Sequence, residues 1–148
     1  MLVVSLVVGR RAVPGYWRAY DATVLKGRMQ RYELAVIRLA VGRVAQAVGT
    51  RRVIVTADRG FADVALLTCL SQLGVTFIIR VKAGTHVAFQ GKWRQLGQWR
   101  FRGHERHRSF GALPYCESWP QRLWVSKSRA RDAKGNWGIW HLVSNRPY

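Results

Sequence analysis

The sequence predicts an α/β fold, and three observations carry that prediction. Between residues 2 and 82, short apolar segments of strand character alternate with longer segments of helical periodicity. This strand–helix–strand–helix–strand order is typical of an α/β sheet. After Ala83, short apolar runs are separated by Gly, Pro and Ser, and six of the seven Trp residues lie in this second half. We therefore expect a β-rich subdomain there rather than a continuation of the α/β layer.

The first elements follow from their own residue patterns. Leu2–Val8 is apolar and rich in β-branched residues, which predicts a strand buried on both faces. Residues 10–20 contain Pro and Gly and predict a turn with a short extended piece. Apolar residues recur at helical spacing from Gln30 to Val48, and Gly49 is expected to end that helix.

The next elements repeat this alternation. Val53–Ala57 predicts a second buried strand, with Asp58 directly at its carboxyl end. Residues 62–73 return to a helical period, in which Cys69 is expected to lie in the core. Val75–Ile79 then predicts a third strand that runs into Arg80 and Lys82.

Composition narrows the class of function. The 148 residues include 25 Lys and Arg, 20 of them Arg, against 7 Asp and Glu, which gives a net charge of +18. A hydrophobic content of 49% argues against a disordered tail. Because guanidinium groups match phosphate geometry and stack on bases, this balance favours a nucleic-acid partner over a membrane surface.

Targeting signals and cysteine spacing bear on the location of the protein. The longest apolar run is too short to span a bilayer, and it lacks the flanks of a signal peptide. Cys69 and Cys116 lie far apart without metal-ligand spacing, so neither a disulfide framework nor a zinc site is indicated. A cytoplasmic location is the expectation.

Asp58 is the leading candidate for a catalytic residue. Functional side chains of open α/β sheets gather at the carboxyl ends of strands, and a carboxylate there is a natural ligand for Mg²⁺. The alternative is structural: Asp58 would cap the helix that starts near Ala62 or close a turn before Gly60. Asp63 is expected in the first turn of that helix, complementing its dipole.

Arg and aromatic residues interleave in the second half, most clearly in Trp99-Arg100-Phe101-Arg102. On a strand, this alternation would put aromatic rings on one face and guanidinium groups on the other. Such a face could bind phosphates and stack bases, whereas the alternative is a Trp core with a solvated Arg face. The short stretch from His104 to His107 is more consistent with a loop than with a metal site.

The block Thr56-Ala57-Asp58-Arg59-Gly60-Phe61, with the following helix and strand, resembles the second catalytic block of the DDE transposases of bacterial insertion sequences (the IS-four family). The stretch from Val3 to Pro14 looks like the strand pair after that family's first aspartate. Leu142-Val143-Ser144-Asn145 looks like the short strand before its third acidic residue.

The resemblance implies a partial ribonuclease-H-like α/β core over residues 1–82. A β-rich Arg/Trp insertion would span 83–141, and a truncated return strand 142–148. It also implies Mg²⁺- or Mn²⁺-dependent strand cleavage and transfer in cut-and-paste DNA transposition. The implied partner is double-stranded DNA at the transposon ends, with a homodimer of the complete protein, no membrane and a cytoplasmic, nucleoid-associated location.

Residue by residue, Asp58 matches the second aspartate of the triad, as catalytic residue and metal ligand. Arg80 matches a basic position close to the DNA. The full set of expected DNA-binding residues is Arg59, Arg80, Lys82, Arg94, Arg100 and Arg102. The resemblance also implies a base-stacking tryptophan, which is not assigned among Trp93, Trp99, Trp119 and Trp124.

The first aspartate and the final glutamate block of the family have no match in these residues. The sequence therefore predicts an internal transposase fragment that is inactive alone. One alternative is a non-catalytic basic nucleic-acid-binding module, whose binding would depend neither on Asp58 nor on divalent metal. Another is an Mg²⁺ nuclease with a complete site, for which seven scattered carboxylates are too few.

Overall fold

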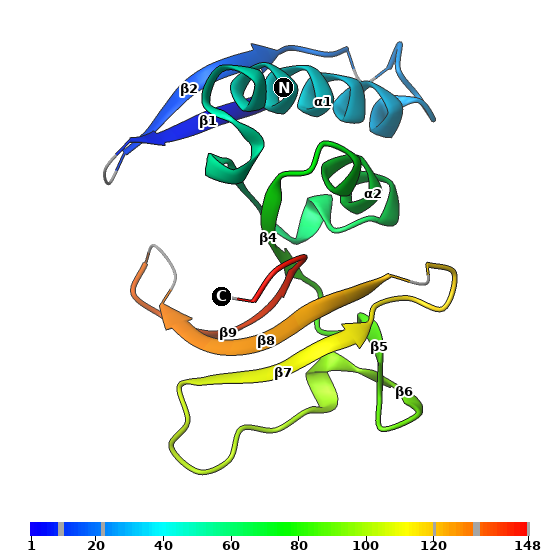
Figure 1. Cartoon of the computed structure of the whole chain (residues 1–148), viewed down its shortest axis with the longest axis vertical. Coiled ribbons are helices and arrows are strands. Elements are labelled where there is room, and N and C mark those ends of the chain that lie inside the picture. The colour runs from blue at the N-terminus through cyan, green and yellow to red at the C-terminus, as the bar shows by residue number, and fades with distance from the viewer. Residues whose placement is uncertain (9–10, 22, 120, 132–133, 148) are drawn as a thin grey trace.

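The computed structural model describes residues 1–8, 11–21, 23–119, 121–131 and 134–147. These residues form a mixed α/β structure around a five-stranded sheet of order β3-β4-β9-β8-β7. Figure 1 shows β4, β9, β8 and β7 of this sheet. Gly9 and Arg10 of the family-like stretch from Val3 to Pro14 lie outside the described residues, as does Tyr148.

Two strands of the first half begin this sheet. β3 (Ile54–Ala57) pairs in parallel with β4 (Thr76–Val81), and the crossover between them contains α2 (Val64–Gln72). A parallel pair needs such a crossover, which is why the strand–helix–strand pattern predicted this unit. β4 spans the predicted third strand and extends it through Arg80 to Val81.

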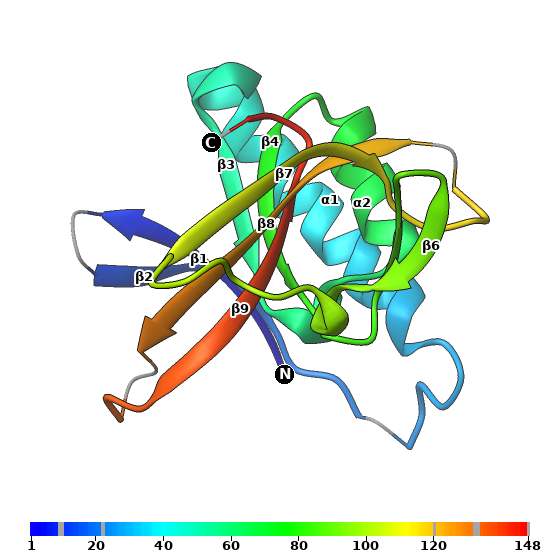
Figure 2. The same ribbon diagram turned by 90° about the horizontal axis from the view of Figure 1, so that it is seen from below.

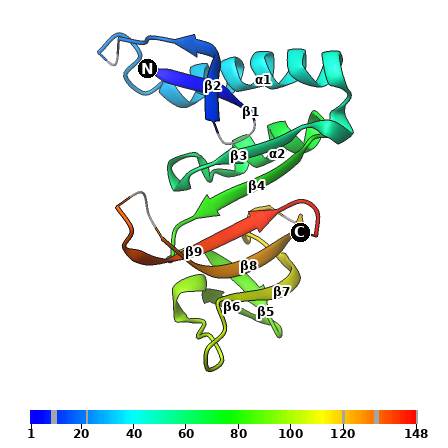
Figure 3. The same cartoon turned by 90° about the vertical axis from the view of Figure 1, so that its left-hand side faces the viewer.

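Three strands of the second half complete the same sheet. β9 (Trp137–Ser144) pairs antiparallel with β4, β8 (Arg122–Arg131) with β9, and β7 (His107–Pro114) with β8. Figure 3 shows the strands following one another from β3 to β7. The second half is rich in strands, but β7, β8 and β9 continue the α/β sheet across residue 82. The expectation of a layer separate from the first half is thereby corrected.

The sheet has two chemically different faces. On the inner face, Phe77, Ile79 and Val81 are buried to 2% exposure or less and pack with α2 in one hydrophobic cluster. On what we call the outer face, Ile78 and Arg80 of β4 are half-buried, and Leu142 of β9 stands opposite Arg80. Successive strand residues point to opposite faces, so the alternation in β4 separates the core from the surface.

Both predicted helices are present. α1 (Met29–Val48) buries one stripe, including Val36, Ile37 and Val41, and ends where Gly49 takes a φ of +88°. That left-handed conformation costs glycine nothing, which explains the stop. α1 and α2 lie side by side (Figure 2), joined by a hydrogen bond of 3.1 Å from Arg38 Nη2 to Gln72 Oε1. Short 3₁₀ turns η1 (Thr50–Arg52), η2 (Arg59–Phe61) and η3 (Leu96–Gln98) connect elements.

Two strands predicted to be buried are not. β1 (Leu2–Val8) pairs with β2 (Arg11–Arg18) in a separate antiparallel ribbon, and Val3 and Val7 are 41% and 72% exposed. Among the described residues β3 is an edge strand, with Ile54 61% exposed. Continuous hydrophobicity predicted both strands correctly. It predicted their burial wrongly, because burial depends on neighbours that a local pattern does not contain.

A second small ribbon joins β5 (His86–Phe89) to β6 (Lys92–Gln95) beside β7. Its two-residue turn, Gln90-Gly91, has positive φ at both positions, which is the turn geometry that suits the twist of a hairpin. Between this ribbon and β7, the rings of Phe89, Trp99 and Phe110 pack together, with centroids 4.5 to 6.3 Å apart. This aromatic cluster is the local core of the second half.

Candidate nucleic-acid interface

Asp58 lies directly after β3, at the carboxyl end of the strand, as the sequence predicts. Its backbone is extended, its side chain is 64% exposed, and it makes no cap hydrogen bond. The structural alternative, in which Asp58 caps the following helix, is wrong, because Asp63 does so. The Oδ1 atom of Asp63 accepts the Leu66 N–H at 2.7 Å, which places Asp63 at the N-cap rather than inside the first turn. The Asp58 carboxylate is therefore available for other contacts.

Arg80 supplies the cation beside that carboxylate. Parallel pairing places Ala57 next to Ile79, so the following residues of both strands, Asp58 and Arg80, are also neighbours. Nη1 of Arg80 lies 3.4 Å from Oδ1 of Asp58. A long, partly exposed ion pair of this kind contributes about 0 to 1 kcal/mol to stability. The ion pair matters because it holds a carboxylate and a guanidinium group together near the carboxyl ends of β3 and β4.

Trp140 gives Arg80 a second support on the outer face. The guanidinium carbon of Arg80 lies 4.9 Å from the centre of the Trp140 ring, a cation–π contact. Trp140 precedes Leu142 by two residues on β9, and Leu142 is paired with Arg80, so both side chains lie on one face of the sheet. The sequence analysis singled out Arg80 but missed Trp140. No sequence signal marks Trp140, because its contact with Arg80 depends on the pairing of β9 with β4.

The residues around Asp58 do not fit a two-magnesium site. No group of three or more His, Cys, Asp or Glu side chains that could hold a metal ion occurs among the described residues. The charged partner of Asp58 is a guanidinium group rather than a second carboxylate. Because Mg²⁺ gives up its waters reluctantly and prefers several oxygen ligands, Asp58 beside Arg80 is a poor holder for it.

The expected DNA-binding residues fall into two groups. Arg59 and Lys82 are exposed and lie next to the Asp58–Arg80 pair, one after Asp58 and the other just beyond β4. Arg94 lies on β6, and Arg100 and Arg102 follow η3. The β5–β6 ribbon is beside β7, the sheet edge opposite β3 (Figure 3), so these three residues do not share the site of Asp58.

Burial alternates from Trp99 to Arg102 as expected, but these residues do not form a strand. Trp99 is 8% exposed and Phe101 is half-buried, whereas Arg100 and Arg102 are exposed. Of the tryptophans left unassigned, Trp99 and Trp119 are core residues and Trp93 is 37% exposed. Cations also stack on rings along β8 and β9: Arg129 lies 5.1 Å from the Phe101 ring and Arg131 4.9 Å from the Trp137 ring.

Two buried basic groups lie on the inner face, where β8 and β9 pair. Lys127 stands opposite His141, and the two residues are 4% and 6% exposed. The Lys127 ammonium donates a hydrogen bond to the backbone oxygen of Trp99, and burial lowers its pKa. Burial, reinforced by the charges of Lys127 and Arg80, lowers the pKa of His141 to about 4. His141 is therefore neutral at pH 7.

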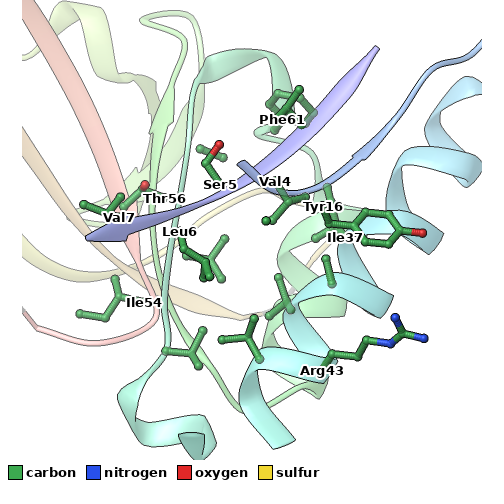
Figure 4. Close-up of a pocket in the computed structure, with 18 of the residues that line it drawn as sticks. Val4, Ser5, Leu6, Val7, Tyr16, Ile37, Arg43, Ile54, Thr56 and Phe61 are labelled. Atoms are coloured by element: carbon green, nitrogen blue, oxygen red, sulfur yellow. The ribbon is translucent and has the colours of Figure 1, made fainter. Parts of the chain in front are cut away.

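A separate cavity of about 750 Å³ lies between the β1–β2 ribbon, α1 and β3. Figure 4 shows Val4 and Leu6 of β1, Ile37 of α1 and Ile54 of β3 around it. Its lining is mainly apolar, and Asp58 contributes to its wall. No helix in the described part of the chain is long and apolar enough to cross a membrane.

Comparison with known proteins yields no relative. No protein-family model matches the chain, and neither a curated protein nor a solved structure is significantly similar to it.

Proposed function

We propose that this chain is a DNA-binding domain of a DDE transposase of the IS-four type, with a ribonuclease-H-like sheet, and that it binds DNA without cutting it when alone. The observation that supports the proposal best is the pairing of Asp58 with Arg80. A partly exposed strand-end carboxylate lies beside a half-buried guanidinium group in a chain with a net charge of +18.

Charge accounts for the DNA binding. Each Lys or Arg that neutralises a phosphate releases a condensed counterion, so affinity falls steeply as salt rises. Arg59, Arg80 and Lys82 lie around the strand ends, where this face would meet the phosphodiester backbone. Electrostatic contacts of this kind are independent of base sequence.

The lack of cutting follows from the carboxylates. In the transposases that the sequence resembles, two aspartates and a glutamate hold the two metal ions that activate the attacking oxygen. In this proposal Asp58 is one member of such a set. Its partners would come from residues beyond these 148, in a complete protein that works as a homodimer on transposon ends. The family's metal chemistry is then not available to the isolated chain.

Titration of DNA binding against salt, with and without Mg²⁺, tests the proposal when it is combined with plasmid nicking. We expect a binding constant that falls about 10³-fold or more between 50 and 200 mM salt, as for six or more phosphate contacts. We also expect no nicking, and no loss of binding in Asp58→Asn beyond that of the exposed-carboxylate control Glu117→Gln. Mg²⁺-dependent nicking that Asp58→Asn abolishes would overturn the claim of inactivity. Absence of DNA binding would overturn the proposal.

The second candidate function is a non-catalytic nucleic-acid-binding module. The stacking of Arg129 on Phe101 and of Arg131 on Trp137, away from Asp58, favours it. Translating the genomic DNA on both sides of the coding region separates the two candidates. A transposase origin predicts an aspartate block upstream and a Tyr…Arg…Glu…Lys block downstream, whereas the module predicts neither.

A further inference from the structure

We propose that Trp140 is the positioning residue for Arg80, holding its guanidinium group across the outer face so that Arg80 binds the phosphodiester backbone. This inference rests on the proposed DNA binding and adds a residue and a role to it. It starts from a contact between two strands that are about 60 positions apart in the chain: the Arg80 guanidinium carbon lies 4.9 Å from the Trp140 ring centre.

Asp58 and Trp140 contact the Arg80 side chain from different sides. Asp58, on β3, approaches one edge of the guanidinium group, with Nη1 to Oδ1 at 3.4 Å. Trp140, on β9, lies under the guanidinium group, with the ring centre 4.9 Å from the guanidinium carbon. β4, which carries Arg80, lies between these two strands, so the side chain is held from both neighbours. An arginine has five N–H donors, and the single contact of Nη1 with Asp58 leaves other donors available for an oxygen ligand.

Pre-ordering explains why this contact would matter for binding. A free arginine side chain loses rotamer freedom when it grips a phosphate, and a chain that fixes the side chain beforehand avoids part of that loss. Arg80 is 31% exposed, so its guanidinium group is held and still accessible to solvent. The Asp58 carboxylate would also repel phosphate on its own, and the adjacent guanidinium offsets that charge.

A matched control exists on the neighbouring strand pair, β8 and β9. Arg131 lies over Trp137 at the same 4.9 Å. Trp137 precedes Trp140 by three residues on β9, and Arg131 stands opposite Trp137 on β8. This second pair therefore lies on the opposite face of the sheet. Trp137 is 58% exposed, and no carboxylate of the described residues forms an ion pair with Arg131. The two pairs therefore share their chemistry and differ in location.

The test measures equilibrium binding of duplex DNA over a salt series for the whole chain and its variants. We expect Arg80→Ala to weaken binding and to reduce the magnitude of the salt slope by about 0.9. Trp140→Leu should weaken binding about three- to tenfold with the slope unchanged, because the charge is retained. Trp140→Phe keeps a ring under the guanidinium and should stay within about twofold of the unsubstituted chain. Thermal melting checks that each variant is folded.

Two comparisons show whether Trp140 acts through Arg80. In an Arg80→Ala background, Trp140→Leu should cause no further loss. The control Trp137→Leu should weaken binding less than Trp140→Leu does. A full additional loss in the Arg80→Ala background, equal losses at both tryptophans, or unchanged binding in Trp140→Leu would each overturn the inference while leaving DNA binding intact. Absence of binding by the unsubstituted chain would overturn the proposed function and this inference together.

Discussion

Acid should destabilise this fold through His141, a buried residue of β9. Its pKa is about 4 in the folded protein, against an ordinary value of 6.5, because burial disfavours the charged imidazolium and because Lys127 and Arg80 add positive charge nearby. Between pH 6.5 and about 4, His141 therefore binds a proton in the unfolded chain but not in the folded chain. Stability from this source is complete above pH 6.5 and is lost as the pH falls through that window.

The size of the effect follows from the two pKa values. Between pH 7.5 and pH 4.5, linkage of one proton to a group with pKa 6.5 in the unfolded and about 4 in the folded state removes about 2.5 kcal/mol from the free energy of unfolding. That is a large share of the stability of a domain this size, which is about 5 to 15 kcal/mol.

Urea denaturation at the two pH values measures the loss. His141→Gln removes the titrating group and should lower the pH-dependent loss by about 2.5 kcal/mol relative to the unsubstituted chain. The control His104→Gln changes an exposed histidine and should leave the loss as it is. If His141→Gln retains the full pH-dependent loss, the burial of a neutral imidazole beside Lys127 is not its cause.

Three further substitutions test packing and local hydrogen bonds by urea denaturation at pH 7.5. Leu70 is completely buried, so Leu70→Ala should cost about 2 to 5 kcal/mol; Leu39→Ala, at a position 43% exposed, should cost under 1, and equal losses would contradict the assigned core. Asp63→Ala removes the cap of α2 and should cost about 1 kcal/mol, whereas Asp58→Ala should cost 0.5 or less; the reverse order would contradict the capping assignment. Asn145→Ala removes hydrogen bonds to two backbone groups at the start of β4 and should cost about 1 to 3 kcal/mol; no change in the urea midpoint would show that water replaces them.

Local patterns predicted the elements whose signals are local. The apolar spacing from Gln30 to Val48 and the glycine after it predicted α1 to within one residue, because both features act within a helical turn. Cys69 lies in the core, as its helical pattern indicates. The exposure of β1 and of Ile54 was missed, since burial on a second face depends on partners elsewhere in the fold.

The sequence predicted individual residues of the candidate site, but it did not predict which of them are in contact. Asp58 and Arg80 were each singled out, but the parallel pairing that places them together comes from the structure. The contribution of Trp140 depends on β9 pairing with β4, a register that the sequences of the two strands do not specify. Lys127 and His141, which pair between β8 and β9, are buried, although polar residue types alone would place them at the surface.

The position of β9 between β4 and β8 has a consequence for how the chain is made. The ribosome delivers β4 early, but β9, the strand that pairs with it, emerges more than 50 residues later. At 5 to 20 residues per second, the nascent chain waits about 3 to 11 s with one edge of β4 unpaired. During that interval β3, α2 and β4 have no link to β8, and the backbone N–H and C=O groups along the free edge of β4 are available to other chains. A nascent chain that pauses between residues 82 and 136 should therefore depend on the chaperones that bind at the ribosome exit.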